Sequence, residues 1–128
     1  MAGNRPLKLV VITPERRVLE TDADSVVIPA HDGELGILPG RAALMCELGI
    51  GRLRYRHAGR GGAALIDGGF AQVVGNTVTV LTPQALRSDE VSEDRLAGAE
   101  REVAAAATPD ARRQARRRLA VMRRVGAS

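Results

Sequence analysis

The chain has 128 residues, a length that suffices for one compact domain with a small appendage and excludes two large domains. Its apolar content of 45 % is almost entirely aliphatic, because Tyr55 and Phe70 are the only aromatic residues. The formal net charge is +4, yet residues 1–91 hold ten basic and ten acidic side chains. The net positive charge therefore comes entirely from residues 92–128. This excludes a uniformly basic surface of the kind that binds nucleic acid.

Short apolar runs from residue 7 to about residue 86 are separated by Gly, Pro, Asn and Asp at intervals of about 8 to 12 residues. This pattern is typical of small all-β domains, and we expect a β-sandwich of about ten short, mostly antiparallel strands. The clearest strand candidates are residues 7–12, 25–30, 42–48, 51–56, 63–67, 70–74 and 77–82.

The connections between these runs carry their own signals. The stretch HDGELGILPG, residues 31–40, concentrates three glycines, a proline and two acidic residues between two apolar runs, which predicts a sharp turn. The Gly75-Asn76 pair adopts positive φ at low cost and predicts a hairpin, and a second reversal is expected at residues 57–62.

Residues 52–56 alternate strictly, so that Leu53 and Tyr55 face one side of a strand and the three arginines face the other. This predicts a strand with one buried and one wet face. Cys46, the only cysteine, lies in the apolar run ALMCEL and is expected to be a small buried core residue. Since no apolar run reaches the roughly 18 to 20 residues of a membrane span, we expect a soluble protein in a reducing compartment.

The apolar period changes near residue 88. A first helix is expected after Ser92, which can cap it, with an apolar stripe at positions 96, 99, 103 and 107. Thr108 and Pro109 then predict the N-cap and first position of a second helix, with its stripe at positions 111, 115, 119 and 122. We therefore divide the chain into a β-sandwich domain, residues 1–87, and an antiparallel αα-hairpin, residues 88–128.

Helices of about 15 residues are marginal by themselves in water, so the hairpin needs a surface to pack on. If two such surfaces differ by a few kcal/mol, the hairpin can act as a switch. Six arginines of the second helix lie on the side opposite its apolar stripe: Arg112, Arg113, Arg116, Arg117, Arg123 and Arg124. A seventh, Arg118, lies beside the stripe.

Three interpretations of this basic helix stay open. A charge run is most often a solvated face. Binding of nucleic acid or an anionic membrane is disfavoured, because no aromatic residues are interleaved for stacking or insertion. The third is contact with an acidic protein partner.

Catalytic chemistry has little support. The sequence contains no GxSxG, CxxC, HExxH or P-loop pattern, and His31 and His57 are isolated from each other and from Cys46. We expect no catalytic residues and no metal site. A free-standing β-domain adaptor, whose basic helix binds nucleic acid or an acidic protein, is one function compatible with these residues.

Taken in order, GELGILPG, then IDGGFAQVVGNTVTVLT, then a short helical hairpin, resemble the epsilon subunit of bacterial F-type ATP synthases. The resemblance covers essentially the whole chain. It implies a non-catalytic rotor subunit of a proton-translocating enzyme, in which the sandwich binds the gamma subunit and the c-ring and the hairpin regulates ATP hydrolysis. It also implies a peripheral location at the cytoplasmic face of the bacterial plasma membrane, with membrane association only through the complex.

The resemblance implies site residues as well. The loop that contacts the ring corresponds to His31, Asp32, Gly33, Glu34 and Gly36, with glycines shaping a projecting turn and carboxylates facing basic groups of a partner. In an extended hairpin, the arginines at positions 112, 113, 116, 117, 123 and 124 would meet the acidic surface of the alpha/beta catalytic hexamer.

Some relatives bind ATP through an I/L-D-x-x-R-A motif at the start of the first helix. The aligned residues here are VSEDRL, residues 91–96, so that Arg95 alone remains of the polar pair that defines the motif. We expect no cofactor, and weak binding of ATP through its phosphates stays open.

Overall fold

The computed structural model describes residues 5–127, which form eight strands, a short 3-10 turn and two helices. The bounds in chain order are β1 (Leu7–Ile12), β2 (Arg17–Ala23), β3 (Ser25–Ala30), β4 (Gly33–Ile37), β5 (Leu44–His57), β6 (Arg60–Val74), β7 (Thr77–Leu81), β8 (Ala85–Arg87), η2 (Ser88–Glu90), α1 (Glu93–Ala105) and α2 (Pro109–Gly126).

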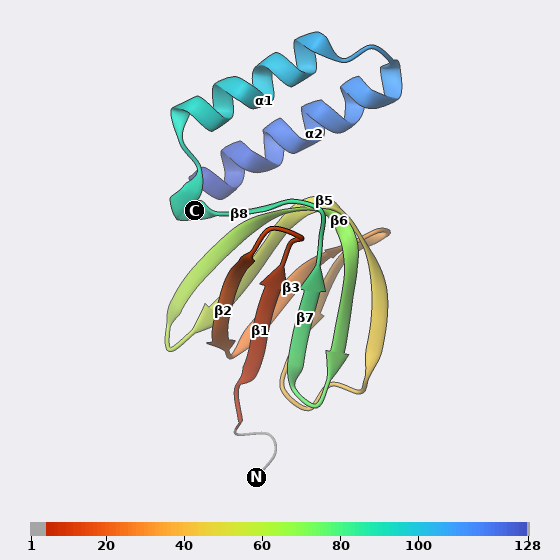
Figure 1. Ribbon diagram of the computed structural model, residues 1–128. Helices are drawn as coiled ribbons and strands as arrows, with labels where there is room; N and C mark the ends of the chain where they lie inside the picture. Colours follow the sequence, from red (N-terminus) through yellow and green to blue (C-terminus); the bar gives the residue numbers. More distant parts are fainter. Residues whose placement is uncertain (1–4, 128) are drawn as a thin grey trace.

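The strands are hydrogen-bonded in the order β2-β1-β7-β6-β5-β3-β4, and β8 pairs with β6. Every pair is antiparallel except β1 with β7. The sheet folds over on itself because β5 and β6 are long and take part in both layers (Figure 1). The first half of β6 pairs with β8 and its second half pairs with β7. The predicted sandwich, mostly antiparallel, followed by a helical hairpin, is confirmed.

There are eight strands within residues 5–127 rather than about ten, because neighbouring runs merge. Residues 42–48 and 51–56 belong largely to β5, and residues 63–67 and 70–74 belong to β6. Glycines make the bends possible without ending the strand: Gly69 has φ +100, and a Cβ there would lie 2.0 Å from the Leu81 carbonyl oxygen. Only a residue without a side chain lets β6 approach β7 this closely.

Both predicted reversals are present. Gly75 and Asn76 have φ values of 55 and 62, and they join β6 to β7. Ala58 and Gly59, with φ values of 51 and 80, join β5 to β6. Positive φ at both central residues suits the right-handed twist of paired strands, which is why these sequences form tight hairpins.

The helix starts also follow local chemistry. The Ser92 hydroxyl accepts a hydrogen bond from the Arg95 amide at 3.2 Å, and the Thr108 hydroxyl accepts one from the Ala111 amide at 3.1 Å. Each bond satisfies an amide that has no partner within its helix. Two stripe assignments are corrected: residue 107 follows the end of α1, and Ala111, in the first turn of α2, is exposed.

Two apolar cores result. The first lies between the two layers of the sandwich and draws on most of the strands. The second lies between the helices and the outer side of the sandwich, where Leu65 and Leu86 pack against apolar residues of α1 and α2, among them Ala99, Leu119 and Met122. α2 lies between α1 and the sandwich (Figure 1). The hairpin is therefore packed on the sandwich in this structure.

Candidate functional site

The acidic stretch expected to form a sharp turn is the hairpin between β3 and β4. Ala30 pairs with Gly33, so His31 and Asp32 alone make the reversal, and both are exposed. Gly33 has φ +139, which favours glycine. Gly36 does not shape the turn, which corrects our expectation: it is a strand residue opposite Val27, without positive φ.

The two carboxylates of this hairpin differ in their surroundings. Glu34 accepts hydrogen bonds from the Arg54 guanidinium at 3.2 and 3.3 Å, so part of its charge is balanced within the chain. Asp32 lies near Cys46, and burial, followed by the Asp32 charge, raises the pKa of that thiol. Cys46 is only partly buried, at the edge of the sandwich core rather than inside it. Asp32 is thus the more available anion for a partner.

The six arginines assigned to the basic helix are all exposed, but several have partners within the chain. Arg117 Nε donates to the Ile50 carbonyl oxygen at 2.7 Å, Arg113 pairs with Asp110 and Arg123 pairs with Glu100 at 3.5 Å. Of these three bonds, that of Arg117 joins the hairpin to the sandwich, that of Arg123 joins α2 to α1, and that of Arg113 lies within α2. Arg112 and Arg116 line a hollow beside the turn between the helices.

Arg118, which lies beside the apolar stripe of α2, is paired with two carboxylates of the chain. Its Nε donates to Asp67 Oδ2 at 2.7 Å, and its Nη1 lies 3.4 Å from Glu102 Oε2. The side chains of Arg118 and Asp67 are only 20 % and 17 % exposed. The pair joins α2 to the bend of β6, and Glu102 brings α1 into the same contact.

Arg95 lines a small cavity of about 160 Å³ together with Arg118, Glu102 and Gln84. This volume is below the roughly 300 Å³ at which small-molecule pockets begin. Arg118, the other arginine that lines this cavity, is already paired with Asp67 and Glu102.

An exposed apolar area on the sandwich was missed by our sequence analysis. Phe70 and Leu81 are 55 % and 53 % exposed and are direct partners on β6 and β7. They border a hollow of about 490 Å³ together with Ile12, Pro14 and Pro83. We call these five residues the apolar hollow. Large apolar residues at strand positions that alternate with buried ones are the signal that could have revealed it.

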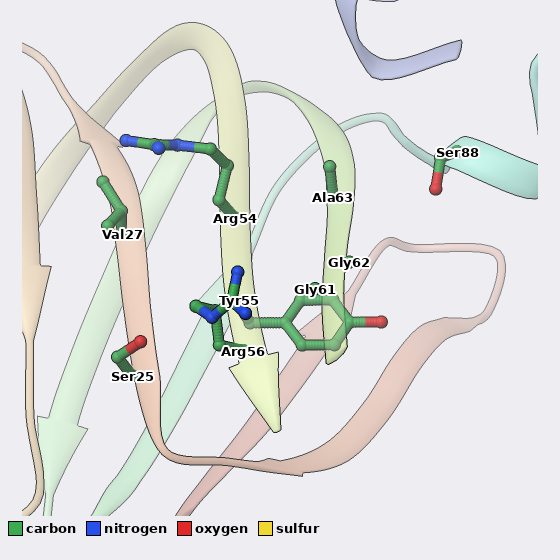
Figure 2. Close-up of a pocket in the computed structure, with 9 residues that line it drawn as sticks. All are labelled: Ser25, Val27, Arg54, Tyr55, Arg56, Gly61, Gly62, Ala63 and Ser88. Atoms are coloured by element: carbon green, nitrogen blue, oxygen red, sulfur yellow. The ribbon is translucent and has the colours of Figure 1, made fainter. Parts of the chain in front are cut away.

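A second hollow, of about 310 Å³, is lined mainly by residues of β3, β5 and β6 (Figure 2). The Tyr55 ring reaches across to β6, where a Cβ on Gly62 would lie 2.2 Å from Tyr55 Cζ, so glycine is needed there. Arg54 points the other way, over Val27 of β3 (Figure 2). The residues of the described chain that line this hollow include no histidine, cysteine or carboxylate, and hence no acid–base pair.

Within residues 5–127, no group of three or more His, Cys, Asp or Glu side chains is arranged to hold a metal ion. In the same range no helix combines the length and the apolar character needed to cross a bilayer.

Comparison with known proteins decides the family. The model of the β-sandwich domain of the ATP synthase delta/epsilon chain matches residues 6–88, which is most of the chain. The chain belongs to the ATP synthase delta/epsilon family. The resemblance drawn from GELGILPG and the hairpin that follows it is thereby confirmed.

Relatives of the delta/epsilon family include ATP synthase epsilon chains from three bacteria. That of Carboxydothermus hydrogenoformans is 45 % identical over 89 residues, which are 70 % of this chain and 66 % of the relative. The Rhodopirellula baltica chain is 43 % identical over 69 % of each chain, and the Pelotomaculum thermopropionicum chain is 39 % identical over 77 % of this chain and 74 % of the relative. The matched region thus spans about two thirds to three quarters of these relatives.

Two solved structures share the fold. A chain of the Euglena gracilis mitochondrial ATP synthase, solved with OSCP, F1 and c-ring, superposes with a TM-score of 0.70 at 22 % identity and covers 96 % of this chain and 81 % of that one. A chain of the central stalk and c-ring of the Tetrahymena thermophila mitochondrial ATP synthase gives a TM-score of 0.61 at 19 % identity and covers 94 % and 96 %. Both superpositions extend beyond the sandwich to the hairpin.

Proposed function

We propose that this chain is a non-catalytic subunit of the rotor of a bacterial ATP synthase. The sandwich binds the gamma subunit and the c-ring, the hairpin regulates ATP hydrolysis, and the chain associates with the cytoplasmic face of the plasma membrane only through the complex. Family membership supports an ATP synthase subunit, and the surfaces of the sandwich support the assignment of its partners.

The apolar hollow is the observation that carries this proposal. Contiguous apolar side chains that stay exposed on a protein surface are candidates for a protein interface. None of the residues that line the hollow belongs to α1 or α2, so the packed hairpin leaves it open. We assign this face to the gamma subunit.

The hairpin between β3 and β4 supports a separate contact with the c-ring. His31 and Asp32 project at the reversal, and the exposed Asp32 carboxylate is suited to pair with a basic group on a ring loop. Such an exposed pair adds little affinity by itself, so its role is to orient the sandwich on the ring.

The hairpin supports the regulatory part of the proposal. In the packed position, its charges are balanced by the sandwich and by α1. If the hairpin leaves the sandwich, Arg117 loses its bond to the Ile50 carbonyl oxygen, and if the two helices also separate, Arg123 loses Glu100. Both arginines would then become available to the acidic surface of the alpha/beta hexamer. No nucleotide is needed to hold the packed position, because Asp67 and Glu102 already neutralise Arg118.

The test is recovery of partners with tagged chains expressed in the source cells. We expect wild type to recover gamma and the ring subunit, and Phe70→Glu to weaken recovery of gamma by about tenfold or more, because a carboxylate would be buried in an apolar interface. Gln114→Glu places the same charge on the exposed side of α2 and should leave recovery unchanged. Recovery of nucleic acid or an unrelated acidic protein without gamma would instead favour the free-standing adaptor.

A further inference from the structure

The hollow of about 310 Å³ beside Tyr55 has a polar end and an apolar end. We call it the tyrosine hollow, and its lining includes Ser25, Tyr55, Arg56, Gly61 and Gly62 (Figure 2). It shares no lining residue with the apolar hollow that we assign to the gamma subunit, and none of its lining residues belongs to α1 or α2. It is therefore a separate feature of the sandwich.

The polar end is formed by two neighbouring strands. Ser25 and Arg56 are direct partners on β3 and β5, so their side chains project on the same face. Arg56 Nη2 donates to a neutral acceptor, the Gly59 carbonyl oxygen, at 3.2 Å, and no ion pair within residues 5–127 includes Arg56. The Ser25 hydroxyl makes no hydrogen bond in that range either. Both groups can donate to the same anion.

The balance of charge limits what this end can hold. The tyrosine hollow has a second arginine in its lining, Arg54, but Arg54 points away over Val27 (Figure 2) and already donates to Glu34. Arg56 is thus the one cation of the lining without a carboxylate partner in the described part of the chain. This arrangement suits a single negative charge.

The apolar end is built from glycine and one aromatic ring. Gly62 is required by packing, because a Cβ there would lie 2.2 Å from Tyr55 Cζ. Gly61 has no such requirement: its φ is not positive, and a Cβ would lie 3.7 Å from Arg56 Nη1 and 3.8 Å from the Tyr55 carbonyl oxygen, which are ordinary contacts. Glycine weakens a strand, and one reason to keep it is the close approach of a ligand.

We propose that the tyrosine hollow binds a monocarboxylate that carries a flat apolar group, such as 3-phenylpropionate. Arg56 and Ser25 hold the carboxylate, and the apolar group lies over Gly61 beside the Tyr55 ring. The volume lies at the lower end of the range for small-molecule pockets, which fits a ligand of this size. The inference concerns the isolated chain and does not depend on the rotor assignment.

The first test is calorimetric titration of the full chain with 3-phenylpropionate. Binding should weaken by about tenfold or more for 3-phenylpropionamide, which lacks the charge, and for acetate, which lacks the apolar group. An amide or an acetate that binds as tightly as 3-phenylpropionate would overturn the proposal.

Two matched arginines test the polar end. Arg56→Gln should bind 3-phenylpropionate about tenfold more weakly, as expected for loss of one charge-assisted contact. Arg60→Gln is the control, because Arg60 is exposed on the same β5–β6 hairpin but does not line the tyrosine hollow. The control should bind as wild type. Equal affinities of the two variants would contradict the role of Arg56.

Gly61→Val tests the apolar end. Valine is favoured in strands, so the melting temperature should not fall, yet its side chain fills the floor of the tyrosine hollow and should weaken binding by about tenfold or more. A folded Gly61→Val chain that binds as wild type overturns the proposal. If this variant does not fold, the comparison of Arg56→Gln with Arg60→Gln decides by itself.

A carboxylate next to an apolar group has two sources, a free acid or the C-terminal residue of a polypeptide. The peptide acetyl-Gly-Gly-Phe with a free carboxylate distinguishes them. Peptide affinity equal to or above that of 3-phenylpropionate supports the proposal and assigns the site to a polypeptide C-terminus. Binding of 3-phenylpropionate without binding of the peptide supports it and assigns the site to a small acid. Failure of both to bind overturns it.

Discussion

Arg118 Nε donates to Asp67 Oδ2 at 2.7 Å, and this bond joins the second helix to the bend of β6 across 51 residues of sequence. Both side chains are mostly buried, at 20 % and 17 % exposure. Two other hairpin contacts, from Arg123 to Glu100 and from Arg113 to Asp110, lie on exposed side chains. Exposed ion pairs contribute little to stability, whereas a buried charge that loses its partner lowers stability strongly.

Asp67→Asn should therefore loosen the hairpin specifically. We expect the free energy of hairpin packing to fall by about 2 kcal/mol, because Arg118 would lose its closest counter-charge in a partly dry site. Hydrogen exchange of α2 amides measures this change. Glu102→Gln, at a carboxylate that is 59 % exposed, serves as the control and should cost less than about 0.5 kcal/mol. Equal exchange rates in the two variants would contradict the role of the buried pair.

The same variant predicts a change in the assembled enzyme. If the extended hairpin restrains hydrolysis, Asp67→Asn should lower the ATPase rate of the reconstituted complex by about twofold or more, because a shift of about 2 kcal/mol changes the ratio of packed to extended hairpins by about 30-fold. Deletion of residues 89–128 should raise the rate. ATPase rates that are unchanged in both complexes would refute the regulatory role.

Glu90 predicts a pH dependence at the junction between sandwich and hairpin. Its Oε1 accepts from the Arg87 amide at 2.9 Å, and its Oε2 lies 2.7 Å from Arg16 Nη2. Burial by itself would raise the pKa of Glu90, but the bonds from Arg16 and Arg87 outweigh it and hold the pKa below its usual 4.5. The carboxylate therefore stabilises the fold fully above about pH 4.5.

As the pH falls through the lowered pKa of Glu90, this stabilisation is lost. Denaturant unfolding of wild type and Glu90→Gln should thus differ by about 1 to 2 kcal/mol at neutral pH, and the difference should shrink below pH 4.5. A difference that stays constant down to pH 3 would show that ionisation of Glu90 is not involved.

Glycine positions in two strands give a matched pair of substitutions. Gly69→Ala should destabilise the chain by about 3 kcal/mol or more, because a Cβ would lie 2.0 Å from the Leu81 carbonyl oxygen at φ +100. Gly36→Ala should change stability by less than about 1 kcal/mol, since nothing lies within 4 Å of its Cβ position. Thermal unfolding of both variants measures the contrast, and similar melting temperatures would contradict it.

Much of the fold was predictable from local patterns. Ser92 and Thr108 cap the helices as expected, and Gly75-Asn76 forms the expected hairpin, because these features depend on backbone geometry within a few residues. The merging of short runs into β5 and β6 was not predictable. A glycine inside an apolar pattern looks the same whether it ends a strand or bends it, and the neighbouring strand decides which.

The candidate sites divide in the same way. The acidic residues at 32 and 34 and the arginines of α2 could be named from residue type and spacing alone. That Glu34 is paired with Arg54, and that Arg118 is held by Asp67, could not, since no spacing rule connects residues 20 or 51 positions apart. The apolar hollow likewise requires knowing which faces of β6 and β7 stay uncovered.

The sequence by itself determined the element types, the turns, the caps and the family resemblance, because each rests on side-chain chemistry and backbone freedom over short distances. Only the tertiary structure decided which charges are neutralised and which surfaces remain open. Coulomb energy and desolvation depend on distance in space and on burial, and packing α2 against β5 brings Arg52 and Arg124 to one cleft although 72 residues separate them in the chain.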